Sequence, residues 1–157
     1  MKEIFGDIFL DAPKDSWIVI TTNIGWKKNG ENPMGRGIAG RMANIFPEIR
    51  KDYGSWCIKN REKIYFWTNS EYGIRVICAP TKPLDVENPH LSWKKKSDMN
   101  LIRNSLHQIK EFSLKNPTET VMLPLMGTDN GRLPVKDVVK LIREMNLPDN
   151  VILTFRD

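Results

Sequence analysis

The sequence predicts an α/β sandwich built on one mixed sheet. Two observations support this prediction. Short apolar runs alternate with stretches of helical periodicity through most of the chain, and two glycine-bearing loops each follow an apolar run and precede a helical one. Both loops are therefore expected at the carboxyl ends of strands, where open α/β sheets bind ligands. Two such loops facing one crevice would hold a diphosphate from both sides.

The first part of the chain is expected to form two strands and two helices. Residues 4–9 have the apolar character of a strand, although a Gly-Asp pair within them marks a bend or a ligand approach. Residues 17–22, with the sequence WIVITT, are almost wholly apolar, as in a strand that is covered on both faces. Apolar side chains then recur at helical spacing over residues 38–46, where a proline ends the helix. A second helix is expected over about residues 48–60.

The middle of the chain predicts a hairpin, a long loop and a helix. Residues 64–68 and 74–79 are expected to pair in an antiparallel hairpin because a short polar loop joins them. Residues 81–96 show no regular period and are interpreted as a long loop of the functional or mobile kind. Ser97 is expected to cap the helix that follows. After this helix we expect a strand over residues 120–125 and the second glycine-bearing loop over residues 127–134. A helix over residues 138–145 and a last strand over residues 151–155 close the chain.

Length and composition limit the class of protein. The 157 residues, 40% hydrophobic and 27% charged, suit a single domain over residues 1–157 whose core needs neither disulfides nor a structural metal. No apolar run approaches the roughly 20 residues of a membrane span, and the N-terminus lacks a signal-peptide core. We therefore expect a cytoplasmic monomer with no membrane partner. Cys57 and Cys78 lie inside apolar patterns, which favours buried free thiols.

The net charge of +5 would suit a phosphate-bearing partner. Most lysines are scattered as on a solvated surface, and only Lys27 with Lys28 and residues 94–96 are adjacent. Specific nucleic-acid binding stays open as an alternative that the sequence supports weakly.

Five short motifs resemble the macro domain family, whose members bind ADP-ribose. In order along nearly the whole chain, they are residues 6–8, 21–23, 34–39, 80–82 and 124–127. The MGRGIA loop together with the Pro-Thr-Lys element is closest to the branch with terminal ADP-ribose protein glycohydrolase, the DNA ADP-ribosyl glycohydrolase antitoxins and the ADP-ribose-1''-phosphate phosphatases. The resemblance implies a three-layer α/β/α sandwich with a mixed central sheet.

The resemblance also implies a ligand site that uses no cofactor and no metal. Asp7 would accept a hydrogen bond from the adenine amino group, Ile8 would add a backbone contact, and Asn23 would lie near the distal ribose. The two loops would hold the diphosphate mainly through backbone N–H groups. The other ligand-binding residues that it implies are Thr22, Met34, Gly35, Gly37, Ile38, Ala39, Pro80, Thr81, Leu125, Gly127, Thr128, Asn130, Gly131, Arg132 and Leu133.

Lys82 is the candidate for the chemistry. In the glycohydrolase members the matching lysine is implicated as a nucleophile toward the anomeric carbon of the distal ribose, through an opened sugar and an imine. This role requires an amine with a lowered pKa. In the terminal glycohydrolase an aspartate assists the lysine, but by spacing the matching position in this chain is Gly131, which has no carboxylate. Asp129 and Asn23 are therefore the candidate helpers. Asp85 and Glu87 are further candidate acids.

Three functions remain open at this stage. The first is hydrolysis of ADP-ribosyl linkages on a modified protein or DNA. The second is hydrolysis of ADP-ribose-1''-phosphate, which needs a positioned water and an acid or base such as His90 or Asp129. The third is a non-catalytic module that binds ADP-ribose or a related nucleotide. In the antitoxin pattern a histidine and a tryptophan almost directly follow the lysine, whereas residues 83–89 intervene here before His90 and Trp93, so a loop of different shape is expected.

Overall fold

The computed structural model describes residues 1–156 and contains a six-stranded sheet with the order β1-β6-β5-β2-β4-β3. All neighbouring strands are parallel except β3, which runs antiparallel to β4. The predicted mixed sheet and the predicted hairpin are therefore confirmed. The strands are β1 (Lys2–Phe5), β2 (Trp17–Asn23), β3 (Tyr65–Asn69), β4 (Ile74–Lys82), β5 (Val121–Pro124) and β6 (Val151–Phe155).

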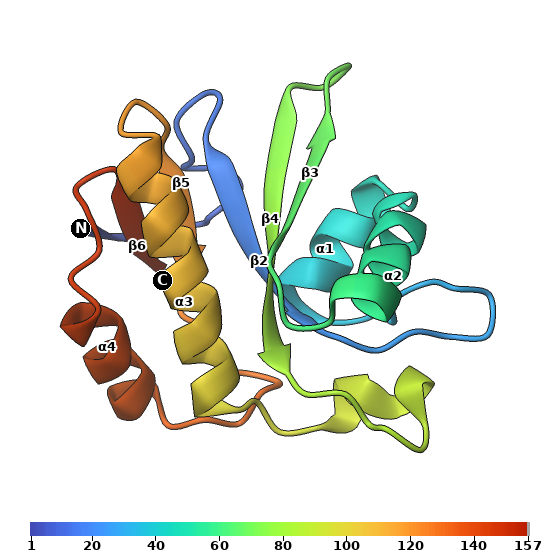
Figure 1. The fold of residues 1–157 in the computed structure, drawn as a ribbon. Helices are drawn as coiled ribbons and strands as arrows, with labels where there is room; N and C mark the ends of the chain where they lie inside the picture. The colour runs from blue at the N-terminus through green and yellow to red at the C-terminus, as the bar shows by residue number, and fades with distance from the viewer. Residues whose placement is uncertain (157) are drawn as a thin grey trace.

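Helices cover both faces of the sheet, which gives the three-layer α/β/α sandwich (Figure 1). The helices α1 (Gly37–Ile45) and α2 (Ile49–Asn60) lie on one face, and α3 (Met99–Lys115) and α4 (Val135–Glu144) lie on the other. Strand β2 contributes to both cores: Val19 packs on the α3 and α4 side, while Ile18 and Ile20 pack on the α1 and α2 side. Alternate side chains of a strand face opposite ways, so the apolar run of β2 reflects burial on both faces.

The first strand is shorter than the sequence predicts. It ends at Phe5, whereas residues 4–9 were expected to be extended. The Asp7 carboxylate accepts hydrogen bonds from the backbone N–H groups of Phe9 at 2.9 Å and Leu10 at 3.1 Å. Such a side-chain-capped turn competes with the sheet ladder and ends the strand.

The predicted cap of α3 is wrong by one residue. Asp98, not Ser97, is the N-cap, and its carboxylate accepts a hydrogen bond from Leu101 N at 2.9 Å. Ser97 is 5% exposed, and its backbone N–H donates to the carbonyl of Gly131 at 3.0 Å. The serine is therefore part of the contact between the segment before α3 and the second glycine-bearing loop.

The segment over residues 81–96 is more regular than expected. Strand β4 continues through Lys82, and a 3₁₀ helix, η1, spans Pro89–Lys94. The Ser92 hydroxyl donates to Pro89 O at 2.8 Å and accepts from Asp85 N at 2.9 Å, which closes the segment on itself. The fixed backbone brings Trp93 back toward the end of β4.

Both cysteines are buried, as the apolar patterns around them predict. Burial raises the pKa of the Cys57 thiol to about 12, and it also raises that of Cys78. Neither group is therefore a thiolate nucleophile at neutral pH. None of the helices within residues 1–156 combines the length and hydropathy that a membrane span needs.

Candidate functional site

A cavity of about 1190 Å³ lies along the carboxyl ends of the parallel strands. Its wall includes the last or nearly last residue of each of them: Phe5, Asn23, Lys82, Pro124 and Phe155. Ligands of open α/β sheets bind at this edge, and small-molecule sites measure roughly 300–1,000 Å³. The cavity is therefore large enough for a dinucleotide-sized ligand and part of whatever is attached to it.

Two glycine-bearing loops face each other across this cavity. The first loop, residues 24–36, leads from β2 into α1, and the second loop, residues 125–134, leads from β5 into α4. A Cβ atom added to Gly37 would lie 3.3 Å from Asn130 Nδ2, so the two loops nearly touch there. Gly37 and Gly127 have φ values of 60° and 74°, a region that favours glycine. By contrast, a Cβ atom at Gly35 would meet nothing within 4 Å.

The cavity brings most of the predicted site residues together. Those that line it are Asp7, Ile8, Thr22, Asn23, Met34, Gly35, Gly37, Ile38, Ala39, Thr81, Lys82, Leu125, Gly127, Thr128, Asp129, Asn130 and Gly131.

Three predicted binding residues lie outside the cavity wall. Pro80 is buried within β4, and its carbonyl accepts a hydrogen bond from Ser105 Oγ at 2.8 Å. Leu133 packs in the core on the α3 and α4 side. Arg132 is exposed, and its guanidinium donates to the carbonyl of Lys94 at 3.1 Å. The further candidates His90, Asp85 and Glu87 do not line the cavity either.

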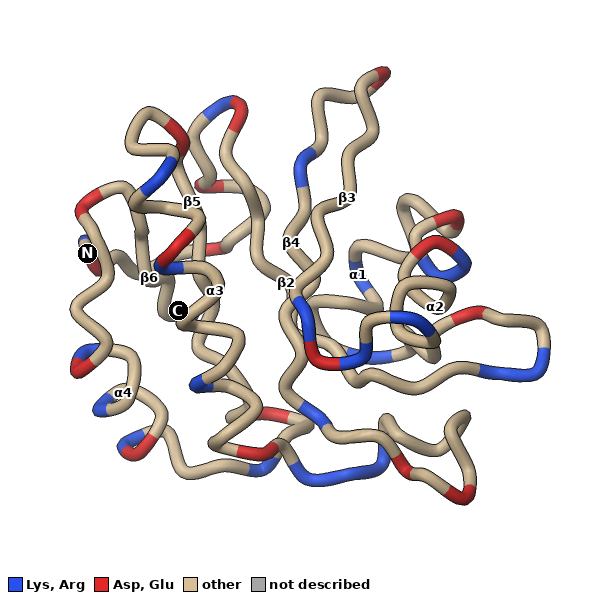
Figure 2. Tube along the Cα trace, viewed as in Figure 1, with Lys and Arg blue, Asp and Glu red and all other residues tan. Residues whose placement is uncertain are grey.

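The Lys82 amine is held at the β4 end of the cavity. Its Nζ donates a hydrogen bond to the carbonyl of Trp93 at 2.8 Å, which fixes the long side chain. Burial, followed by the nearby charges of Arg132 and Arg36, lowers the pKa of this amine below its ordinary value. A run of three lysines, residues 94–96, lies just before α3, and Figure 2 shows this segment as a continuous blue stretch. The Lys82 amine therefore loses its proton more readily than an exposed lysine does.

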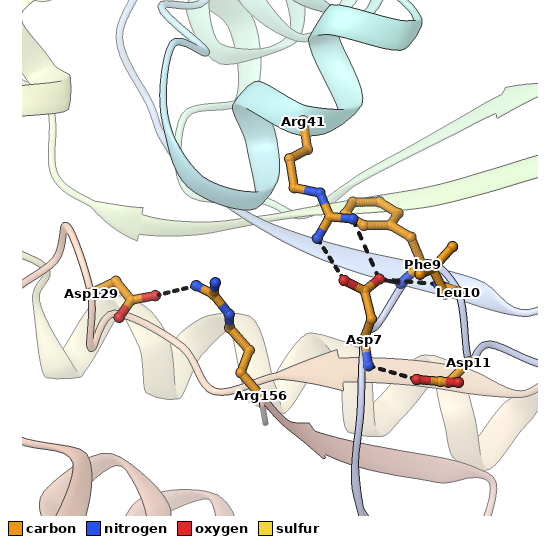
Figure 3. Close-up of polar contacts among 7 residues, drawn as sticks. All are labelled: Asp7, Phe9, Leu10, Asp11, Arg41, Asp129 and Arg156. Carbon is orange, nitrogen blue, oxygen red and sulfur yellow. Dashed lines mark hydrogen bonds and ion pairs between the residues drawn. The ribbon is translucent and has the colours of Figure 1, made fainter.

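Asp129, the first candidate helper, lines the opposite part of the cavity and points to a cation (Figure 3). Its carboxylate lies 3.4 Å from Arg156 Nη1, and both side chains are largely exposed, at 75% and 86%. A carboxylate accepts hydrogen bonds, so Asp129 could hold a water or take up a proton at this part of the cavity.

The absence of an acid at position 131 has a steric reason. A Cβ atom on Gly131 would collide with Ser97 Oγ and would lie 2.5 Å from the carbonyl oxygen of Gly127. No side chain fits there unless the backbone shifts. The second loop of this chain therefore packs against the segment before α3 in a way that excludes an aspartate at this position.

The carboxylate of Asp7 already has several partners (Figure 3). Besides the N–H groups of Phe9 and Leu10, its Oδ2 accepts from Arg41 Nη1 at 2.9 Å, and the Arg41 guanidinium lies 4.5 Å from the centre of the Phe9 ring. The hydrogen bond from Arg41 is the main cause that lowers the pKa of this carboxyl. Asp7 is therefore anionic at neutral pH, and a carboxylate has about four acceptor positions, so it can still accept from a ligand amine.

The orientation of the Asn23 amide follows from a buried network. Its Oδ1 accepts from Gly25 N at 3.0 Å and from Asn32 Nδ2 at 3.1 Å, and its own Nδ2 donates to Pro33 O at 3.1 Å. Asn32 is 0% exposed and donates in addition to Asn23 O and Gly25 O. The second amide hydrogen of Asn23 is left for a ligand. An amide does not titrate, so the Asn23 side chain could orient a ligand but could not move a proton.

Several cavity residues were not among the predicted site residues. Trp93 and Arg36 belong to segments that the sequence singles out, but their side chains had no assigned role. Phe155 ends the last strand and Arg156 follows it, and the rule that ligands bind at carboxyl ends of strands would have indicated both. Asn32 and Arg41 carry no comparable local signal. Within residues 1–156 no group of three or more His, Cys, Asp or Glu side chains is arranged to hold a metal ion.

The strand order, the two loops and the cavity define the macrodomain fold, and solved structures of that fold match the chain. The macrodomain of Mycobacterium tuberculosis DarG matches with a TM-score of 0.75 and 24% identity over 99% of this chain and 98% of its own. The macrodomain of Thermus aquaticus DarG gives 0.74 and 22% over 99% and 97%. Thermosipho africanus DarTG, solved in complex with ADP-ribose, gives 0.78 and 19% over 100% of this chain and 42% of its own.

At these identities the likeness establishes the fold. The resemblance inferred from the motifs is confirmed at that level, with DarG macrodomains among the similar structures. No family model matches the sequence, and no curated protein matches it.

Proposed function

We propose that the chain binds ADP-ribose in this cavity and hydrolyses the bond between the distal ribose and an acceptor, with Lys82 as the nucleophile. The observation that carries the proposal is the Lys82 amine, which is anchored by Trp93 O at the cavity wall and has a lowered pKa. The solved complex of DarTG with ADP-ribose, in which 42% of the DarTG chain matches this fold, supports the choice of ligand. Residues 1–157 would act as a single macrodomain.

The ligand would lie along the strand ends. Adenine would lie at the β1 and β6 end, where Asp7 offers an anionic acceptor and Phe155 an aromatic face. The diphosphate would lie between the two loops, because glycines let the backbone N–H groups approach phosphate oxygens. The distal ribose would then reach Asn23 and Lys82 at the β2 and β4 end.

The chemistry would begin with attack of the neutral Lys82 amine on the anomeric carbon of the distal ribose. The bond from that carbon to the acceptor breaks, and the acceptor leaves with its electron pair and takes up a proton. The opened sugar is then held as an imine on Lys82. Water adds to the imine and releases ADP-ribose and the free amine. Asp129 is the candidate to position this water.

Two measurements test the proposal in order. Calorimetric titration with ADP-ribose tests binding, and no binding at millimolar ligand would refute the premise. Release of ADP-ribose from modified protein or DNA tests catalysis. Lys82→Ala should abolish this release, and so should Lys82→Arg, which keeps the charge but has no accessible neutral form. Lys59→Ala, an exposed cation on α2, is the matched control.

The alternative functions correspond to other outcomes of the same assays. Release of phosphate from ADP-ribose-1''-phosphate that survives Lys82→Ala would favour the phosphatase. Binding of ADP-ribose without either activity would leave a binding module. In either case the role of Lys82 as nucleophile would be rejected.

A further inference from the structure

Arg50, in the first turn of α2, joins the end of the first loop to the end of the helix that follows it. Its Nη1 donates to the carbonyl of Ala43 at 3.0 Å, in the last turn of α1. Its Nη2 donates to Asn44 Oδ1 at 3.2 Å and to the carbonyl of Met34, in the first loop, at 3.4 Å. The Arg50 side chain is half-buried and belongs to the cavity wall.

The last turn of α1 needs such a donor. In an α-helix the carbonyl of Ala43 would accept from the N–H of residue 47, which is Pro47 and has none. This helix also has no basic residue in its last turn. Arg50 therefore supplies both a donor and a cation to the carboxyl end of the helix. A guanidinium has five N–H donors, so capping the helix leaves others for the Met34 carbonyl.

The hydrogen bond to Met34 orients a peptide of the first loop. The C=O and N–H groups of a trans peptide point in opposite directions. Because the Met34 carbonyl is turned toward Arg50 on α2, the Gly35 N–H is turned away from α2. A Cβ atom at Gly40 would lie 2.9 Å from Gly35 C and 3.1 Å from Gly35 O, so the next carbonyl packs against α1 and leaves the Arg36 N–H on its other side.

These N–H groups are available to a ligand. The backbone N–H groups of Gly35, Arg36 and Gly37 donate none of the hydrogen bonds found within residues 1–156. All three residues are exposed and line the cavity, and a Cβ atom at Gly35 would meet nothing within 4 Å. Unpaired N–H groups at the start of a helix are donors for anions. The direction of the first of them depends on the Met34 carbonyl, and so on Arg50.

We propose that Arg50 is a positioning residue for the diphosphate of ADP-ribose. It acts through the first loop: it holds the Met34 carbonyl on the α2 side and so keeps the Gly35 N–H directed at the phosphate oxygens. The inference rests on the proposed function, since it takes ADP-ribose to be the ligand. Loss of the Arg50 fork should therefore weaken the binding of ligands that carry the diphosphate and spare those that lack it.

The first experiment compares the affinities of ADP-ribose, by calorimetry, and of adenosine, which has no phosphate, by NMR titration. Arg50→Lys and Arg50→Gln each retain a donor that can cap α1 but lack the planar fork. Both variants should bind ADP-ribose about ten-fold more weakly, the equivalent of one hydrogen bond, and adenosine as the wild-type chain does. Circular dichroism shows that each variant is folded at the temperature of the titration.

Lys51→Ala is the matched control. Lys51 also lies on α2 and its Nζ also donates to a carbonyl of the first loop, that of Asn29 at 2.9 Å. Asn29 does not line the cavity, so this second tether holds a part of the loop away from the ligand. Lys51→Ala should leave the affinities for both ligands unchanged.

The second experiment follows the Gly35 N–H by amide NMR. In the wild-type chain saturating ADP-ribose should move the Gly35 amide proton downfield, because the donor gains a phosphate acceptor. In Arg50→Lys the same ligand should give less than about half of that shift, because the peptide is no longer held. The Ile8 amide, at the adenine end, should respond as in the wild-type chain.

Three results would overturn the inference while the proposed function stands. An equal loss of affinity for ADP-ribose and adenosine would mean that Arg50 only supports the fold. Wild-type affinity for ADP-ribose in both Arg50 variants would mean that the loop does not need the fork. A Gly35 amide that does not respond to ADP-ribose in the wild-type chain would remove the contact that Arg50 is said to position. If the wild-type chain does not bind ADP-ribose at millimolar concentration, the proposed function fails and the inference fails with it.

Discussion

Replacing Asn32 with alanine should weaken both the fold and the ligand site. The side chain is 0% exposed, and its amide donates to Asn23 O at 3.0 Å, Asn23 Oδ1 at 3.1 Å and Gly25 O at 2.9 Å. Asn23 Oδ1 keeps a second donor in Gly25 N, whereas the two backbone carbonyls lose the donor that Asn32 supplies. Leaving a buried acceptor unsatisfied costs about 1–3 kcal/mol. With two such carbonyls, Asn32→Ala should lower the free energy of unfolding by about 2–6 kcal/mol.

Urea unfolding followed by tryptophan fluorescence measures this loss. Asn29→Ala is the matched control, because Asn29 also lies in the first loop but makes its side-chain hydrogen bonds with Glu31 at the surface. That change should stay within about 0.5 kcal/mol. A loss below about 1 kcal/mol for Asn32→Ala would show that water or a rearranged loop satisfies the freed carbonyls, and the network would then have little energetic weight.

The same variant separates a structural role of Asn32 from an orienting one. Without Asn32 the amide of Asn23 loses one of the two donors that hold its oxygen inward. Under conditions where the wild-type chain and Asn32→Ala are both folded, the affinity of Asn32→Ala for ADP-ribose should be about ten-fold lower. This loss is the equivalent of one hydrogen bond of about 1.4 kcal/mol. A large loss of stability with unchanged affinity would refute the orienting role.

The remaining predictions concern glycines, the lysine and the adenine end. Gly131→Ala should cost about 1–3 kcal/mol of stability by overpacking against Gly127 O. Gly35→Ala should leave the melting temperature unchanged but weaken ADP-ribose binding. A lower melting temperature of Gly35→Ala would contradict the open space around a Cβ atom at Gly35. Borohydride trapping of ADP-ribose on Lys82, measured by mass spectrometry, should rise with pH because the neutral amine reacts. The midpoint of this rise should lie below 10.5, the ordinary pKa of a lysine. A midpoint at or above 10.5 would reject the lowered pKa. Asp7→Asn should abolish discrimination between ADP-ribose and its inosine analogue, which lacks the exocyclic amine, and calorimetry with both ligands checks this.

Much of the fold could be predicted because its signals are local or periodic. The unbroken apolar run of β2 requires cover on both faces, and Val19 and Ile20 on opposite faces are both fully buried. The hairpin of β3 and β4 followed from a short polar loop between two apolar runs. These features depend on neighbours within a few residues, which the sequence displays directly.

The details that differ from prediction depend on contacts between distant residues. Ser97 and Asp98 are both able to cap a helix, and the contact of Ser97 with Gly131 decides between them. The partner of Asp7 is Arg41, which lies 34 residues away on α1. The carbonyl that holds Lys82 belongs to Trp93, and it reaches the lysine only because η1 folds residues 89–94 back toward β4. Sequence spacing alone carries none of this information.

The charges of Arg36 and Arg132 make the pKa of Lys82 sensitive to a bound anion. Arg36 and Arg132 help to lower the pKa of the amine while no anion is bound beside them. An anion bound beside Arg36 and Arg132 would offset their charge and raise the pKa of Lys82 again. Added inorganic phosphate should accordingly shift the pH midpoint of borohydride trapping upward in the wild-type chain, and the shift should be smaller in Arg132→Gln.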